Sequence, residues 1–84
     1  MNSNFLILFR LSKLDIQNLH KDRIAIDMDL QEFSTFCNEG WNKTDYSFIV
    51  IDFTQKPSSG KKYRHGFDVL YIPSLYKHAE KEKN

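Results

Sequence analysis

The sequence predicts a small α+β domain, in which one central helix packs on a mainly antiparallel, single-layer sheet of about four strands. Three observations support this fold class. Several short segments are rich in β-branched and aromatic residues, one segment combines helical spacing with start and stop signals, and no linker is long enough to separate two domains. We therefore expect residues 1–84 to form a single domain, with residues 80–84 fraying as a tail.

The first strand is expected at Phe5–Leu11. Both of its alternating faces are apolar, which is typical of a strand buried on both sides, so we place it centrally in the sheet. The following segment, Ser12–Leu19, fits either an extension of this strand or a short helical turn, and both alternatives stay open. Residues 23–28 alternate between an Ile24, Ile26 and Met28 face and an opposite face, which predicts a half-buried strand.

The clearest local signal is a helix expected at Leu30–Glu39. Asp29 can cap its start, and Glu32, three residues later, completes a pattern similar to a capping box. An apolar stripe then falls on one face at helical spacing, made of Leu30, Phe33, Phe36 and Cys37.

The end of this helix is expected at a glycine. Gly40 suits the left-handed residue that follows a helix, which would make Trp41 the next residue of a Schellman motif. In that motif Trp41 contacts Phe36, so the purely structural role of Trp41 is to anchor the end of the helix. A second role stays open, in which Trp41 is a partly exposed anchor that a partner buries.

Two further strands are expected after the helix, at Tyr46–Phe53 and Phe67–Ile72. Pro57-Ser58-Ser59-Gly60 has the composition of a turn, so residues 46–72 predict a hairpin with a long basic tip. Pro73 closes the last strand, and Ser74 can cap a short C-terminal helix.

The basic residues of the chain gather in one segment. Lysine and arginine number 12 and aspartate and glutamate 11, so the formal net charge is +1, which argues against a dedicated polyanion-binding protein. Residues 56–65 nevertheless contain four cations and no acidic residue. They are able to hold phosphates and stack a base, to contact an acidic protein surface, or simply to be a solvated tip. The candidate binding residues are Lys56, Lys61, Lys62, Tyr63, Arg64, His65 and Trp41.

Reactive centres are not recognisable in the sequence. Four aspartates at strand ends, Asp27, Asp29, Asp52 and Asp68, would hold Mg²⁺ only if they converged on one face, and each has a simpler structural role. The single cysteine, Cys37, lies on the apolar stripe without a base at a suggestive spacing. We therefore expect no enzyme, no catalytic residue, no cofactor and no metal.

One segment resembles a known family. Residues 62–71, Lys-Tyr-Arg-His-Gly-Phe-Asp-Val-Leu-Tyr, resemble the late strands of ribosome-dependent, RNA-cleaving toxins. The resemblance covers about ten residues, and those toxins have a pair of helices after the first strand, which this sequence does not predict. It implies RNA cleavage by a small toxin as one alternative function. Independently of the resemblance, the residue types allow this chemistry around His65, where Lys62 and Arg64 would stabilise the charge and Tyr63 or His65 would transfer a proton.

The function expected from these observations is that of a small binding module acting through its surface. It would contact a protein either by strand addition at an exposed sheet edge or through the aromatic residues around Tyr46, Tyr63, Tyr71 and Tyr76. One cysteine, no apolar run of membrane-spanning length and no secretory signal favour the cytoplasm and argue against a membrane partner. The composition suits an AT-rich bacterial or phage genome, and the protein would inhibit or adapt a host protein. Binding of nucleic acid by residues 56–65 is the alternative, and a homo-oligomer joined at a sheet edge also stays open. High aromatic content in a chain this small is a further reason to expect association.

Overall fold

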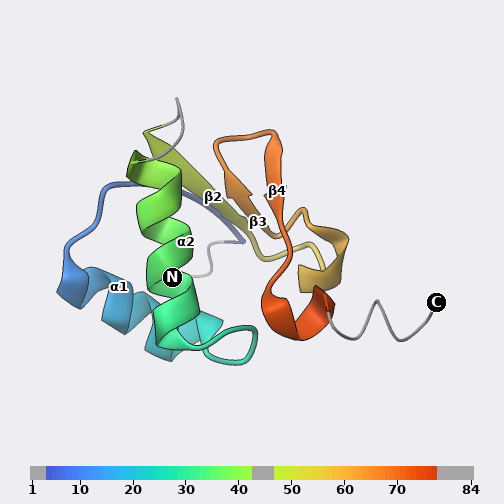
Figure 1. Ribbon diagram of the computed structural model, residues 1–84, viewed down its shortest axis with the longest axis horizontal. Helices are drawn as coiled ribbons and strands as arrows, with labels where there is room; N and C mark the ends of the chain where they lie inside the picture. The colour runs from blue at the N-terminus through green and yellow to red at the C-terminus, as the bar shows by residue number, and fades with distance from the viewer. Residues whose placement is uncertain (1–3, 43–46, 78–84) are drawn as a thin grey trace.

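Alternating apolar residues build a sheet of four antiparallel strands in the order β1-β2-β3-β4. The computed structural model describes residues 4–42 and 47–77. The strands are β1 (Phe5–Phe9), β2 (Phe48–Asp52), β3 (Tyr63–His65) and β4 (Val69–Tyr71). Helix α2 (Leu30–Asn42) crosses one face of this sheet, and helix α1 (Lys13–Leu19) lies beside α2 (Figure 1). The predicted α+β fold class, with a central helix on an antiparallel sheet, is confirmed.

Residues 13–24, which follow β1 after a short connection, are helical. Ser12 accepts a hydrogen bond from the Asp15 N–H at 3.1 Å, so it caps α1 and settles the open choice for Ser12–Leu19. The strand predicted at residues 23–28 is wrong, because α1 continues into a π-helical turn, η1 (His20–Ile24). Ile24 and Met28 are buried four residues apart whereas Ile26 is 80% exposed, which is helical rather than strand spacing.

The placement of the first strand at the centre of the sheet is also wrong. In the observed order β1 is an edge strand, paired with β2 alone among the described residues. Leu6 and Leu8 pack against the buried core under the helices. The opposite face of β1 meets no second layer in the described part of the chain, and its side chains are exposed.

Helix α2 begins where the sequence predicts and ends later. The Glu32 N–H donates to Asp29 Oδ1 at 2.7 Å, which confirms the N-cap. Gly40 is not the left-handed residue after the helix, because α2 runs on to Asn42. The glycine allows close packing instead: a Cβ there would lie 2.6 Å from Ile49 Cγ2 and 2.7 Å from His65 Cδ2.

Residues 48–71 form three strands rather than one hairpin with a basic tip. The loop after β2 contains a short 3₁₀ helix, η2 (Pro57–Ser59), and Gly60 with φ 78°. Residues 63–65, which were expected in the tip, form strand β3, and Gly66 (φ 67°) starts the tight turn into β4. Residues 74–77 are helical, where the C-terminal helix was expected, while Tyr46 and residues 78–84 lie outside the described residues.

The core lies between the sheet and the helices. Its fully buried members include Phe33 and Phe36 from α2, Ile49 and Ile51 from β2, and Tyr63 from β3. Among residues 4–42 and 47–77, no helix has the length and apolar character needed to cross a bilayer.

Candidate functional site

Two of the predicted binding residues, Lys62 and Tyr63, are held by a buried carboxylate. Asp27 Oδ2 accepts from Lys62 Nζ at 2.5 Å and from the Tyr63 hydroxyl at 2.6 Å, and Asp27 Oδ1 accepts from the Tyr76 hydroxyl at 3.1 Å. Tyr63 has no exposed surface, and burial together with the hydrogen bond to Asp27 raises the pKa of its phenol. Lys62 and Tyr63 therefore join β3 to the turn after η1.

Arg64 and His65 point to opposite faces of β3 and both have partners. The Arg64 guanidinium lies 3.8 Å from Asp52 and donates to the Phe67 carbonyl at 3.2 Å, although its Nε is buried without a partner in the described part of the chain. His65 Nε2 lies 2.8 Å from the Phe36 carbonyl, and its ring stacks on Phe36 with centroids 4.6 Å apart. Because the carbonyl can only accept, Nε2 carries the proton.

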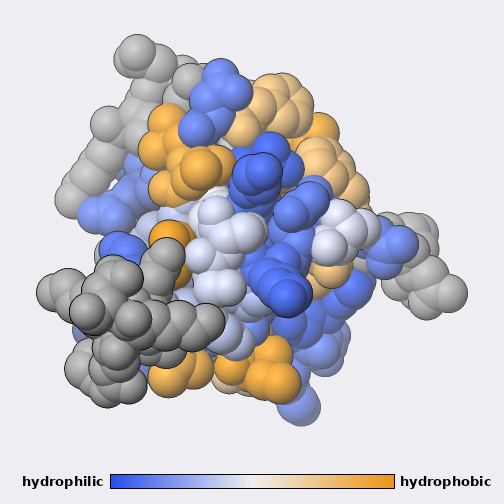
Figure 2. Space-filling model, turned by 90° about the vertical axis from the view of Figure 1, so that its right-hand side faces the viewer, coloured by the Kyte–Doolittle hydropathy of each residue, from blue (hydrophilic) through white to orange (hydrophobic). Residues whose placement is uncertain are grey.

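Of the remaining three predicted residues, Trp41 lies apart from the two lysines, which share one loop. Trp41 is 8% exposed, and its indole N–H donates to the Leu8 carbonyl at 3.1 Å, so it joins α2 to β1. Lys56 and Lys61 are exposed in the loop after β2. The side of the molecule that carries this loop in Figure 1 faces the viewer in Figure 2, and the middle of that view is hydrophilic. The structure thus leaves two freely exposed lysines of the predicted set.

The four aspartates considered as possible Mg²⁺ ligands lie in different parts of the fold. Asp27 is buried, Asp29 caps α2, Asp52 accepts from the Thr54 N–H at 3.0 Å, and Asp68 is exposed in the turn before β4. Within the described ranges, no three His, Cys, Asp or Glu side chains come close enough to hold a metal ion. The Cys37 thiol is fully buried in the core, and this burial raises its pKa to about 12.

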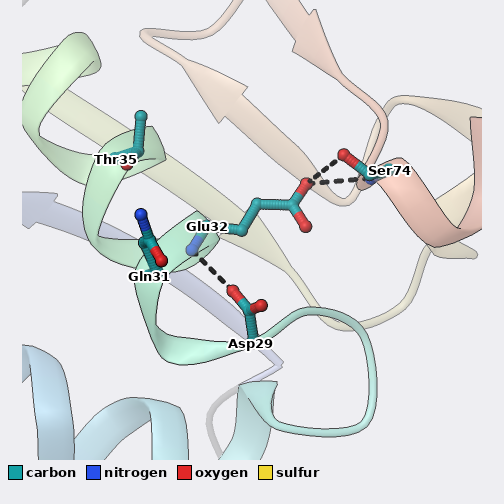
Figure 3. Close-up of a pocket in the computed structure, with 5 residues that line it drawn as sticks. All are labelled: Asp29, Gln31, Glu32, Thr35 and Ser74. Carbon is teal, nitrogen blue, oxygen red and sulfur yellow. Dashed lines mark hydrogen bonds between the residues drawn. The ribbon is translucent and has the colours of Figure 1, made fainter.

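A small open pocket of about 290 Å³ lies at the N-terminal end of α2 (Figure 3). Glu32 reaches from the helix to Ser74, and one of its carboxylate oxygens accepts from the Ser74 N–H at 2.8 Å and from the Ser74 hydroxyl at 3.1 Å. The same oxygen accepts from the Tyr71 hydroxyl at 2.5 Å. Glu32 therefore anchors the segment after β4 and does not complete the predicted capping box. We infer a structural role for this carboxylate.

The most exposed apolar side chains of the sheet gather on the face away from the helices, which we call the open face. Strand register places Ile7, Val50, Arg64 and Leu70 side by side across the four strands on this face. Its exposed members, with their exposed fractions, are Phe5 (46%), Ile7 (43%), Phe9 (62%), Phe67 (50%) and Leu70 (53%). Hydrophobic surface is also visible at the upper right of Figure 2. Sheet faces without a covering layer are usually polar, so this face is a candidate contact surface.

The side chains of the open face include a row of three aromatic rings and one ion pair. Phe48 lies between Phe9 and Phe67, with ring centroids 5.9 Å and 5.0 Å away, so β1, β2 and the turn before β4 contribute to one row. The two charged strand residues of this face, Asp52 and Arg64, pair with each other.

The outer edge of β1 is a second candidate contact. The Phe53 N–H donates to the Asn4 carbonyl at 2.7 Å, which fixes which residues of β1 bond to β2. Because bonded pairs alternate along an antiparallel ladder, the N–H and C=O groups of Phe5, Ile7 and Phe9 point away from β2. No strand pairs with them among the described residues.

Comparison with protein-family models, with curated proteins and with solved structures finds no match to this chain. The chain does have two helices after its first strand, as the RNA-cleaving toxins do, so the departure expected from the sequence is corrected. His65 and Arg64, which would carry that chemistry, have the structural partners described above.

Sequence reasoning missed the open face and its residues. The signal was present in β1, whose two apolar faces also fit a strand with one buried and one uncovered face. Phe67 was expected to start a strand, but it lies in the turn before β4 and reaches the face through its contact with Phe48. The aromatic surface was expected around four tyrosines instead. Tyr63 is buried, the hydroxyls of Tyr71 and Tyr76 bond to Glu32 and Asp27, and Tyr46 lies outside the described residues.

Proposed function

We propose that this protein is a small binding module that takes up an extended segment of another protein along the outer edge of β1. The single observation that carries the proposal is the unpaired edge of β1, where Phe5, Ile7 and Phe9 present their backbone groups. Strand addition would use these groups for affinity, so binding in this way needs no enclosed pocket.

The sequence of β1 supports this role. Natural proteins usually protect an edge strand with lysine, proline, a bulge or a very short length. Strand β1 has five residues, Phe-Leu-Ile-Leu-Phe, with neither a charge nor a proline, and it pairs in continuous register with β2. An edge without these protections is suited to pairing with another chain.

The composition of the chain, which suits an AT-rich bacterial or phage genome, supports a host protein as the partner. We place the protein in the cytoplasm, where it inhibits or adapts a host protein on behalf of a phage or mobile element. Contact with nucleic acid through residues 56–65 and RNA cleavage around His65 stay predictions. The buried positions of Tyr63 and His65 add no support to either.

A proline at position 7 tests strand addition, with alanine at the same position as the matched control. Ile7→Pro removes the outward N–H at the middle of the edge, where proline is tolerated because the N–H does not bond to β2. Ile7→Ala removes the side chain and keeps this N–H. Tagged proteins are used to capture partners from nuclease-treated host lysate, and far-UV circular dichroism verifies that each variant is folded.

We expect a protein that the wild type and Ile7→Ala both capture, and that Ile7→Pro captures at least tenfold less. In the purified complex, the Ile7 and Phe9 amides should exchange with deuterium more slowly than in the free protein. Equal capture by folded Ile7→Pro would contradict the proposal, as would an empty capture by the wild type.

A further inference from the structure

We propose that the open face is the contact surface for a second copy of this chain, so that two sheets pack face to face around a two-fold axis. The inference does not depend on strand addition, because it concerns the face of the sheet and not its edge. It begins from the five side chains of this face that are between 43% and 62% exposed.

The exposed area is large enough to form the centre of an interface. With about 200 Å² for a fully exposed large apolar side chain, these five residues present about 500 Å² per chain. A standard interface buries about 800 Å² per partner, with an apolar centre and a polar rim. The face therefore supplies the apolar centre of a standard interface, and the neighbouring loops would supply the rim.

The charges on the face favour an identical surface as its partner. Strands β1 and β4 contribute no charged residue, and the charges on β2 and β3, Asp52 and Arg64, neutralise each other. A partner with a charged surface would gain nothing from this face, and an identical face is not repelled by it. A two-fold axis that lies between the two sheets and passes over the ion pair would also bring Arg64 of each copy toward Asp52 of the other.

The shape of the face also suits two packed sheets. The row formed by Phe9, Phe48 and Phe67 runs across the strands, and Ile7 and Leu70 lie on the same face. Two such faces can interdigitate at the spacing of about 10 Å that is common in β-sandwiches. Each copy would gain the second layer that its sheet lacks, and the two β1 edges would stay open at the sides of the dimer.

Charged substitutions on and off the face test the inference. Leu70→Lys and Phe67→Lys each place a lysine on the open face, at positions that are already half exposed. Leu14→Lys is the matched control, because Leu14 is 64% exposed on α1, which packs with α2 on the other side of the sheet. Sedimentation equilibrium over a hundredfold range of protein concentration measures the mass of each folded variant.

We expect the wild type and Leu14→Lys to reach twice the 10.0 kDa of one chain, while both face variants stay monomeric or dimerise at least tenfold more weakly. A wild type that is monomeric at every concentration overturns the inference. A dimer that Ile7→Pro abolishes and Leu70→Lys leaves intact also overturns it, because pairing would then use the sheet edge. Partner capture measured on the same variants shows separately whether strand addition fails.

Discussion

Gly40 provides a direct test of how α2 packs on the sheet. A Cβ at this position would lie 2.6 Å from Ile49 Cγ2 and 2.7 Å from His65 Cδ2, whereas ordinary contacts of this type are longer than about 3.4 Å. Neither neighbour moves away easily. Ile49 is β-branched and fully buried in a central strand, and the His65 ring is fixed by its contacts with Phe36.

The expected magnitude follows from two opposed effects. Crowding in a packed core costs about 1–3 kcal/mol, while replacing glycine by alanine within a helix gains about 1 kcal/mol. Gly40→Ala should therefore lower the free energy of unfolding by about 1 kcal/mol, and the larger Gly40→Asn should lower it by about 2–3 kcal/mol. For a domain of this size, each 1 kcal/mol shifts Tm by about 4–8 °C.

Urea and thermal unfolding followed by circular dichroism measure these differences, with the exposed Thr35→Ala as a control for helix propensity. The order of the two variants is decisive. If Gly40 were instead a left-handed residue after the helix, asparagine would be tolerated better than alanine, because asparagine adopts that conformation more readily. Gly40→Asn that is more stable than Gly40→Ala would refute the close packing of α2 on β2 and β3.

Two further predictions concern titratable groups in the core. Because Cys37 is fully buried and its pKa is raised to about 12, its thiol should react at least a hundredfold more slowly with a thiol reagent at pH 8 in the native protein than in urea; an equally fast native reaction would show that the core is open. Burial and Asp27 raise the pKa of Tyr63 above its ordinary value of 10.0, so the unfolded state loses this proton first. Ionisation of Tyr63 should then leave the free energy of unfolding unchanged below pH 10 and lower it above pH 10 by about 1.4 kcal/mol per pH unit. Urea titrations at pH 9 to 11.5 measure this fall, and the same fall in Tyr63→Phe would contradict the prediction.

The sequence allowed the fold class and the start of α2 to be predicted, because both depend on local signals. Asp29 caps the helix through a neighbouring N–H, and this contact needs no knowledge of the rest of the chain. The end of the helix depends on tertiary packing. A glycine at position 40 fits both a helix C-cap and a close helix–sheet contact. Only the positions of Ile49 and His65 in the fold distinguish the two roles.

The candidate binding residues illustrate the same limit. A cluster of cations in the sequence forms an exposed basic surface only if the fold places no carboxylate beside them. Asp27, which lies 35 residues before Lys62, removes Lys62 and Tyr63 from the surface, and Asp52 pairs with Arg64. Spacing along the chain contained no sign of these pairs, so the exposed basic set is smaller than the sequence indicated.

Strand β1 shows why an apolar pattern alone leaves two possibilities. A strand with two apolar faces fits the middle of a covered sheet, and it fits equally an edge strand whose second face meets another molecule. The topology excludes the first possibility within one chain, because β1 lies at the edge. No layer formed by the described residues covers the apolar side chains Phe5, Ile7 and Phe9, and in the proposed dimer a second copy would supply one. On this argument, the pattern that suggested a central strand describes the assembled protein rather than the single copy.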